Sequence, residues 1–143
     1  MILPRLGAVG LFCAGGIYWT DGDLGYFNRG AAPATSRDNV YLKDADPSNP
    51  RAFPALSPAV MAKFTPTLLI SGTCDFALSL AVYAHSVLAA QGVQTDLYVR
   101  EGLGHSLFID RDVPQPLELY AIISRFFQTR PRGADANTRC GHT

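Results

Sequence analysis

The order of apolar and polar positions along the chain predicts alternating strands and helices. Apolar runs at residues 6–13, 67–71 and 95–99 have the length and the Val, Ile and Leu content of short buried strands. Helical periodicity lies at residues 78–91 and 115–129. Strands that alternate with helices through short connections form right-handed crossovers and a parallel sheet. The predicted fold class is therefore α/β, with about three parallel strands and crossover helices.

Each of the two long helices has a set of apolar positions, which in the first helix share one face. In the first helix these positions are Leu80, Ala84, Val87 and Leu88, and Gly92 ends the helix. A shorter helix is expected to begin at Ser57-Pro58 and to end before Pro66. In the last helix the apolar positions are Leu117, Leu119, Tyr120, Ile123, Phe126 and Phe127.

The rest of the chain has little periodicity. Residues 17–53 are rich in Gly, Asp, Asn and Pro and are predicted to be mostly loop, with one short helix around Val40–Lys43. A loop of this length is uncommon inside a compact domain, so it is either functional or part of a larger assembly. Residues 1–130 are assigned to part of one domain, and the polar residues 131–143 to a disordered tail.

Composition excludes several classes of function. The chain has 143 residues, of which 48% are hydrophobic and 17% charged, as in globular proteins. It has 12 basic and 12 acidic residues, and this balanced charge gives no electrostatic reason to expect a nucleic-acid partner or an anionic membrane. No run is long enough to span a membrane. The three cysteines, Cys13, Cys74 and Cys140, fit neither a zinc motif nor a disulfide framework. We therefore expect no metal, no cofactor and a cytoplasmic location, although residues 6–16 after Arg5 also imitate a targeting core.

An acid and a histidine follow two neighbouring strands. Asp75 ends the loop after the strand at 67–71, and His105 ends the loop after the strand at 95–99. Because ligands and functional side chains gather at the carboxyl ends of parallel strands, we expect these two residues to lie together. The alternative is that Asp75 only caps the following helix and that His105 is a turn residue.

The two loops also resemble a known family. The stretches 56–79 and 92–108 resemble the C-terminal part of the hormone-sensitive-lipase-like esterases of the α/β-hydrolase superfamily. The G-x-x-D motif of that family is matched by Gly72-Thr-Cys-Asp75, and its G-x-x-H-type loop by Gly102-Leu-Gly-His105. The resemblance implies a partial α/β-hydrolase fold, hydrolysis of a small acyl ester, and the acid and histidine of a Ser-His-Asp triad at Asp75 and His105.

Two other parts of the family pattern are missing. The 143 residues contain no G-x-S-x-G nucleophile elbow and no H-G-G-type oxyanion loop. The resemblance implies that residues 6–13 are the strand after the nucleophile helix, and that Met1 falls inside the fold. We therefore expect the chain to be inactive alone, with its substrate bound by a longer parent enzyme. The family also makes a homodimer possible.

Other interpretations remain open at this point. Cys13 follows an apolar strand and precedes Asp75 and His105, which is the order of a thiol hydrolase, but Leu11 stands where a cysteine elbow needs glycine. Ser79 imitates an elbow but falls in the crossover helix, and His85 and His142 are expected to be solvated. A non-catalytic α/β module that binds a partner through the strand edge at 6–13 is the alternative from another class.

Overall fold

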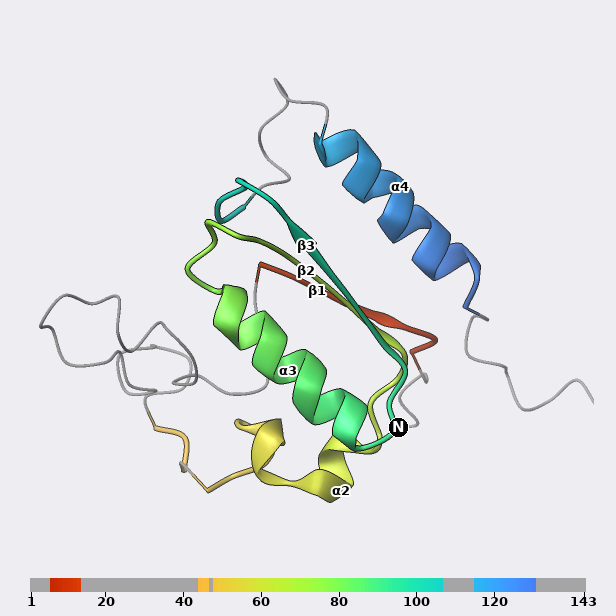
Figure 1. Cartoon of the computed structure of the whole chain (residues 1–143). Coiled ribbons are helices and arrows are strands. Elements are labelled where there is room, and N and C mark those ends of the chain that lie inside the picture. Colours follow the sequence, from red (N-terminus) through yellow and green to blue (C-terminus); the bar gives the residue numbers. More distant parts are fainter. Residues whose placement is uncertain (1–5, 14–43, 47, 107–114, 131–143) are drawn as a thin grey trace, which may run out of the picture.

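The structure is a computed structural model that describes residues 6–13, 44–46, 48–106 and 115–130 (Figure 1). The helix expected around Val40–Lys43, most of the loop at 17–53 and the tail at 131–143 lie outside the described residues.

The three expected strands are confirmed and form one parallel sheet. They are β1 (Val9–Phe12), β2 (Thr67–Gly72) and β3 (Thr95–Arg100), in the order β1-β2-β3. All six residues of β2 are buried, because this central strand is covered on both faces. Within the described part of the chain, β1 and β3 are the two edges of the sheet.

Helices cover both faces of this sheet (Figure 1). On one face α4 (Gln115–Gln128) packs through Leu119, Ile122 and Phe126 against Leu68 and Ile70 of β2. On the other face α2 (Pro58–Met61) and α3 (Leu78–Ala90) form a second core around Leu69; its other buried members are Met61, Ala81, Ala84 and Leu88. Successive residues of β2 therefore serve opposite layers, as the pleat of a strand requires.

The ends of the crossover helix follow from local sequence. Gly92 has φ 75° and accepts the left-handed conformation that ends α3, where its N–H donates to the Ala89 carbonyl over 2.9 Å. The buried face of α3 is shifted from the prediction: Ala81, rather than Leu80, is fully buried beside Ala84 and Leu88. Small residues at these positions let the helix approach the sheet closely.

The buried face of α4 also differs from the prediction. Leu119 and Phe126 are buried as expected, and Ile122 is a buried position that was not predicted. Leu117, Tyr120 and Phe127 are exposed, so only part of the apolar set of this helix packs on the sheet. Leu119, Ile122 and Phe126 recur at the i, i+3, i+7 spacing of a narrow helix stripe.

The segment before β2 is held by local caps. A short 3-10 helix, η2 (Pro54–Leu56), leads into α2, and the Ser57 hydroxyl accepts from the Val60 N–H over 3.4 Å at the helix start, as the sequence predicted. Among the described residues no helix is long and apolar enough to cross a bilayer.

Candidate active site

The acid and the histidine meet at the carboxyl end of the sheet. Asp75 follows β2, His105 follows β3, and the His105 Nδ1 atom lies 2.8 Å from Asp75 Oδ1. The parallel register of β2 and β3 brings the two loops to the same edge, since Gly72 at the end of β2 pairs with Arg100 at the end of β3. The structure therefore brings together the two side chains that the sequence predicted to meet.

This contact fixes the tautomer of a neutral His105. A carboxylate oxygen only accepts hydrogen bonds, so the proton between the two groups is carried by Nδ1. In the neutral imidazole Nε2 is then left with its lone pair. Such a ring can accept a proton at Nε2 while the carboxylate stabilises the resulting imidazolium.

Other groups hold the Asp75 carboxylate in place. The Ser71 hydroxyl donates to Oδ2 over 2.8 Å, and the Ala77 backbone N–H donates to Oδ1 over 2.9 Å. Asp75 thus supports the turn before α3, whose N-cap residue is Ala77, and contacts His105 with the same oxygen. Because both oxygens are bonded, the carboxylate has one well-defined orientation.

The pKa of Asp75 lies below its ordinary value. The largest single influence is burial of the carboxyl, which raises this pKa. Hydrogen bonds from the Ala77 N–H, the His105 ring and the Ser71 hydroxyl lower it and together outweigh burial. The charge of His105 lowers the pKa further. Asp75 is therefore ionised at neutral pH, which is the state that can orient an imidazole.

The imidazole is partly open to solvent. The His105 side chain is 39% exposed, whereas that of Asp75 is fully covered. Phe76 stacks on the imidazole, with ring centroids 4.2 Å apart and planes at 24°. The stacking limits the rotation of His105 and leaves one side of its ring accessible.

Three hydrogen bonds join the acid loop to the histidine loop. The Thr73 N–H donates to the Arg100 carbonyl over 2.9 Å, the Cys74 N–H donates to the Leu103 carbonyl over 3.1 Å, and the Gly102 N–H donates to the Thr73 hydroxyl over 2.8 Å. Gly102 has φ 74°, the conformation that glycine tolerates best. The separation of Asp75 and His105 is therefore set by backbone contacts as well as by their own bond.

Cys13 lies at the same edge of the sheet. It follows β1, is 6% exposed, and donates its N–H to the Ile70 carbonyl over 2.8 Å. Its Sγ atom lies within 4.8 Å of a ligating atom of both Asp75 and His105. Its φ of 53° is uncommon for a non-glycine residue. A cluster of Cys, Asp and His donors is therefore present at this edge of the sheet.

Comparison with known proteins relates this arrangement to esterases. No protein-family model matches the sequence, and a search of curated proteins finds no significant match. Esterase E25 has a TM-score of 0.71 at 30% identity, over 88% of this chain and 41% of that one. Carboxyl esterase 2 from the mycorrhizal fungus Tuber melanosporum has a TM-score of 0.67 at 18% identity, and the match covers 88% of this chain and 45% of that one. An esterase from the bacterial hormone-sensitive lipase family has a TM-score of 0.68 at 21% identity, and the match covers 87% of this chain and 43% of that one.

The chain has part of the α/β-hydrolase fold of hormone-sensitive-lipase-like esterases. It spans less than half the length of each of these three structures. The α/β-hydrolase fold that the two loop motifs implied is thus the observed one, with three parallel strands and helices on both faces.

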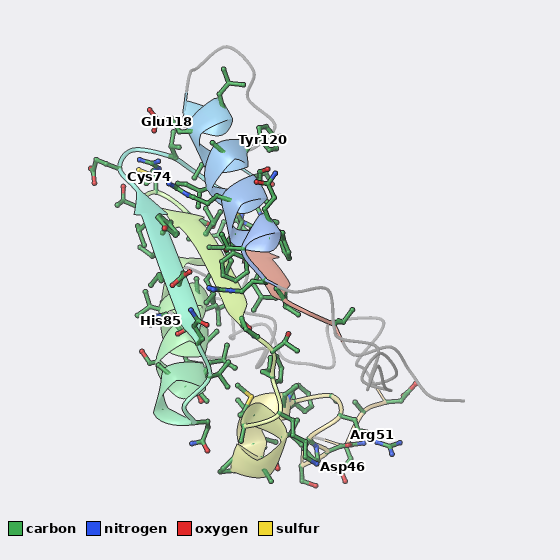
Figure 2. All side chains as sticks on the ribbon, turned by 90° about the vertical axis from the view of Figure 1, so that its right-hand side faces the viewer. Asp46, Arg51, Cys74, His85, Glu118 and Tyr120 are labelled. Atoms are coloured by element: carbon green, nitrogen blue, oxygen red, sulfur yellow. The ribbon has the colours of Figure 1, made fainter. Side chains whose placement is uncertain are left out.

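The other candidates lie elsewhere in this α/β-hydrolase fold. Ser79 is in the first turn of α3, where it borders a shallow apolar surface hollow with Leu78 and Val82. His85 lies further along α3, away from the end of the sheet where Cys74 is found (Figure 2). Cys74 is exposed and lies next to Asp75 in the sequence. Neither Cys74 nor Cys13 forms a disulfide. His142 and Cys140 fall outside the described residues.

Sequence reasoning missed two contributors to the site. Ser71 and Phe76 flank the acid motif, but a serine inside a strand and a phenylalanine in a loop carry no specific signal. Cys13 was a nucleophile candidate because it precedes Asp75 and His105 in the order of a thiol hydrolase, and its place after β1 agrees with that order. If β1 neighbours β2 in a parallel sheet, the residue after β1 must lie beside the acid loop.

Acidification is expected to destabilise the chain partly through Asp75. Its folded pKa lies below the unfolded value, so its contribution is complete above about pH 4 and is lost as the pH falls through the lower folded value. Asp75→Asn should reduce the loss of unfolding free energy in this acid range, by at most about 1.4 kcal/mol per pH unit. Urea denaturation at a series of pH values measures this dependence.

Asp44→Asn is the matched control for this experiment, because it makes the same charge change at an exposed position. Some acid dependence should persist in Asp75→Asn, since hydrogen bonds from the Ser48 backbone and hydroxyl lower the pKa of the exposed Asp46. Equal acid slopes for Asp75→Asn and the natural chain would contradict the assignment.

Proposed function

We propose that this chain supplies the acid and the histidine of a serine-dependent hydrolase of carboxylic esters. The observation that carries the proposal is the 2.8 Å contact between Asp75 and His105 at the ends of adjacent parallel strands. The esterases with the same fold support the choice of reaction. A small acyl ester is the proposed substrate, and a reducing cytoplasm the proposed location.

In this mechanism His105 transfers the proton. Its Nε2 atom takes the proton of a serine hydroxyl as the oxygen attacks the ester carbonyl, and then gives it to the leaving alcohol. Asp75 holds Nδ1–H and stabilises the imidazolium. The serine must come from outside the 143 residues, because these contain no G-x-S-x-G elbow.

The first test is hydrolysis of a short-chain p-nitrophenyl ester by the purified chain. Without a serine elbow, the natural chain should be no faster than His105→Ala, because a triad without its nucleophile retains little beyond background chemistry. His85→Ala is the control for a histidine outside the site. Turnover that requires His105 but not Cys13 would show that the chain holds another nucleophile and would sink this proposal.

A chimera tests the catalytic roles directly. Residues 6–130 would replace the matching part of esterase E25, and the nucleophile would then have to come from the remainder of E25. In an active chimera His105→Ala should lower kcat by about 10⁴-fold or more, and Asp75→Asn by about 10⁴-fold. His85→Ala should leave kcat unchanged. A folded, active chimera that tolerates His105→Ala would contradict the assignment.

A thiol hydrolase is the second candidate, and the position of Cys13 favours it. Its Sγ atom is within 4.8 Å of donor atoms of Asp75 and His105. The thiol would pass its proton to His105 and attack the ester carbonyl, the alcohol would leave with that proton, and water would cleave the thioester. Ester turnover lost in both Cys13→Ala and His105→Ala selects this candidate over the first.

A further inference from the structure

Three side chains from three strand ends bring different ligand atoms together. The Cys13 sulfur, a carboxylate oxygen of Asp75 and a ring nitrogen of His105 all lie within 4.8 Å of one another. Asp75 follows the central strand, and Cys13 and His105 follow the strands on either side of it. We propose that these three residues bind a zinc ion.

The donor set favours zinc over other common cations. Zinc is bound in proteins by cysteine sulfur, histidine nitrogen and carboxylate oxygen, and sites with three protein ligands leave a fourth position open. Magnesium and calcium prefer oxygen ligands throughout, so the thiol and imidazole disfavour them. Bond lengths of zinc to these atoms imply donors about 3.3–3.8 Å apart in a tetrahedral site. From the upper limit of 4.8 Å a pair of donors would have to approach by up to about 1.5 Å, whereas Asp75 Oδ1 and His105 Nδ1, now 2.8 Å apart, would have to separate by about 0.5 Å as the ion replaces their hydrogen bond.

Outer contacts already orient the proposed ligands. The Ser71 hydroxyl bonds Asp75 Oδ2 and the Ala77 N–H bonds Oδ1, while Phe76 stacks on the His105 ring. Metal affinity depends on hydrogen bonds and packing contacts that hold the ligating side chains in place. Mutation of the residues that make these contacts typically lowers metal affinity by about 10–100-fold. Two of the three ligands are therefore preorganised.

The surroundings of the cluster suit a bound ion. Cys13 is 6% and Asp75 5% exposed, and Cys13 packs among Leu68, Ile70 and Leu119. This apolar floor keeps water away from one side of the site. His105, with a side chain 39% exposed, provides the opening through which an ion enters from solvent.

Binding would change the chemistry of both Cys13 and His105. The Cys13 S–H bond is replaced by a zinc–sulfur bond, and the thiol proton leaves to the buffer. Coordination by His105 Nδ1 replaces the hydrogen bond to Asp75, and the ring proton moves from Nδ1 to Nε2. Zinc would therefore inhibit any reaction in which this imidazole accepts a proton at Nε2. The binding itself does not depend on the proposed ester hydrolysis, and it is measured without substrate.

The test is titration of the full, chelator-treated chain with Co²⁺, followed by competition with Zn²⁺. We expect one equivalent of Co²⁺ to give a thiolate-to-cobalt charge-transfer band and visible bands of four-coordinate cobalt, and Zn²⁺ to displace both. Cys13→Ser should abolish the charge-transfer band and weaken Zn²⁺ binding by at least about tenfold. A chain that binds no Co²⁺ at micromolar concentration would overturn the proposal.

Matched thiol variants locate the site. Cys74→Ser removes an exposed thiol next to Asp75, and Cys140→Ser removes one from the Cys140-Gly-His142 segment, so both should keep the band. A band that survives Cys13→Ser and is lost in Cys74→Ser or Cys140→Ser would place the metal elsewhere and refute the site.

Two further measurements apply if Cys13→Ser fails to fold. His105→Ala changes a partly exposed side chain and should also weaken Zn²⁺ binding by at least about tenfold. Zn²⁺ should raise the Tm of the natural chain by more than that of His105→Ala. Equal Zn²⁺ affinity in the natural chain and His105→Ala contradicts the proposal.

Discussion

Leu119→Ala is expected to lower the free energy of unfolding by about 2–5 kcal/mol. Leu119 is 0% exposed and packs with Leu68, Ile70 and Cys13 between α4 and the sheet. Truncation removes its transfer free energy and leaves a cavity that helix and sheet close only in part. Urea or guanidinium denaturation followed by circular dichroism measures the change, and a chain of this size with marginal stability would lose much of its folded population.

Leu117→Ala is the matched control, because it makes the same change on the same helix. Leu117 is 73% exposed, so its truncation should alter the unfolding free energy by no more than about 0.5 kcal/mol. Equal losses from the two substitutions would mean that α4 does not pack on the sheet through Leu119.

Gly72→Ala is expected to cost about 1–3 kcal/mol and to separate Asp75 from His105. A Cβ at Gly72 would overlap the backbone carbonyl of Leu103, with the carbonyl carbon 2.6 Å away. That carbonyl accepts from the Cys74 N–H, so the clash would push apart the loops that carry the acid and the histidine. Denaturation measures the stability, and the NMR signal of the His105 Nδ1–H measures its bond to Asp75.

Gly104→Ala is the control for this substitution. It adds the same methyl group to the histidine loop, where nothing lies within 4 Å of the new Cβ and φ is not positive. We expect stability within about 0.5 kcal/mol of the natural chain and an unchanged His105 signal. A neutral Gly72→Ala would show that the two loops approach each other less closely than described.

The Asp75–His105 pair and the neighbouring Cys13 thiol differ in how well the sequence could predict them. Asp75 and His105 each follow a strand and have glycine at a fixed offset, so topology alone predicted their meeting. Cys13 lacks such a motif, and its relation to them depends on which strand neighbours β2. Strand order is a long-range property that spacing along the chain does not encode.

The sequence by itself determined the alternation of strands and helices, the parallel sheet, the end of α3 at Gly92 and the pairing of Asp75 with His105. These follow from local periodicity, from the φ that glycine adopts and from the rule that parallel strands end at one edge. Only the tertiary structure decided that Ala81 and Ile122 are buried while Leu117 and Tyr120 are exposed, and that Cys13 joins the pair. The burial of a helix residue depends on how much of the helix the sheet covers. The meeting of side chains from different strand ends depends on strand order. Neither is a property of a single segment of the sequence.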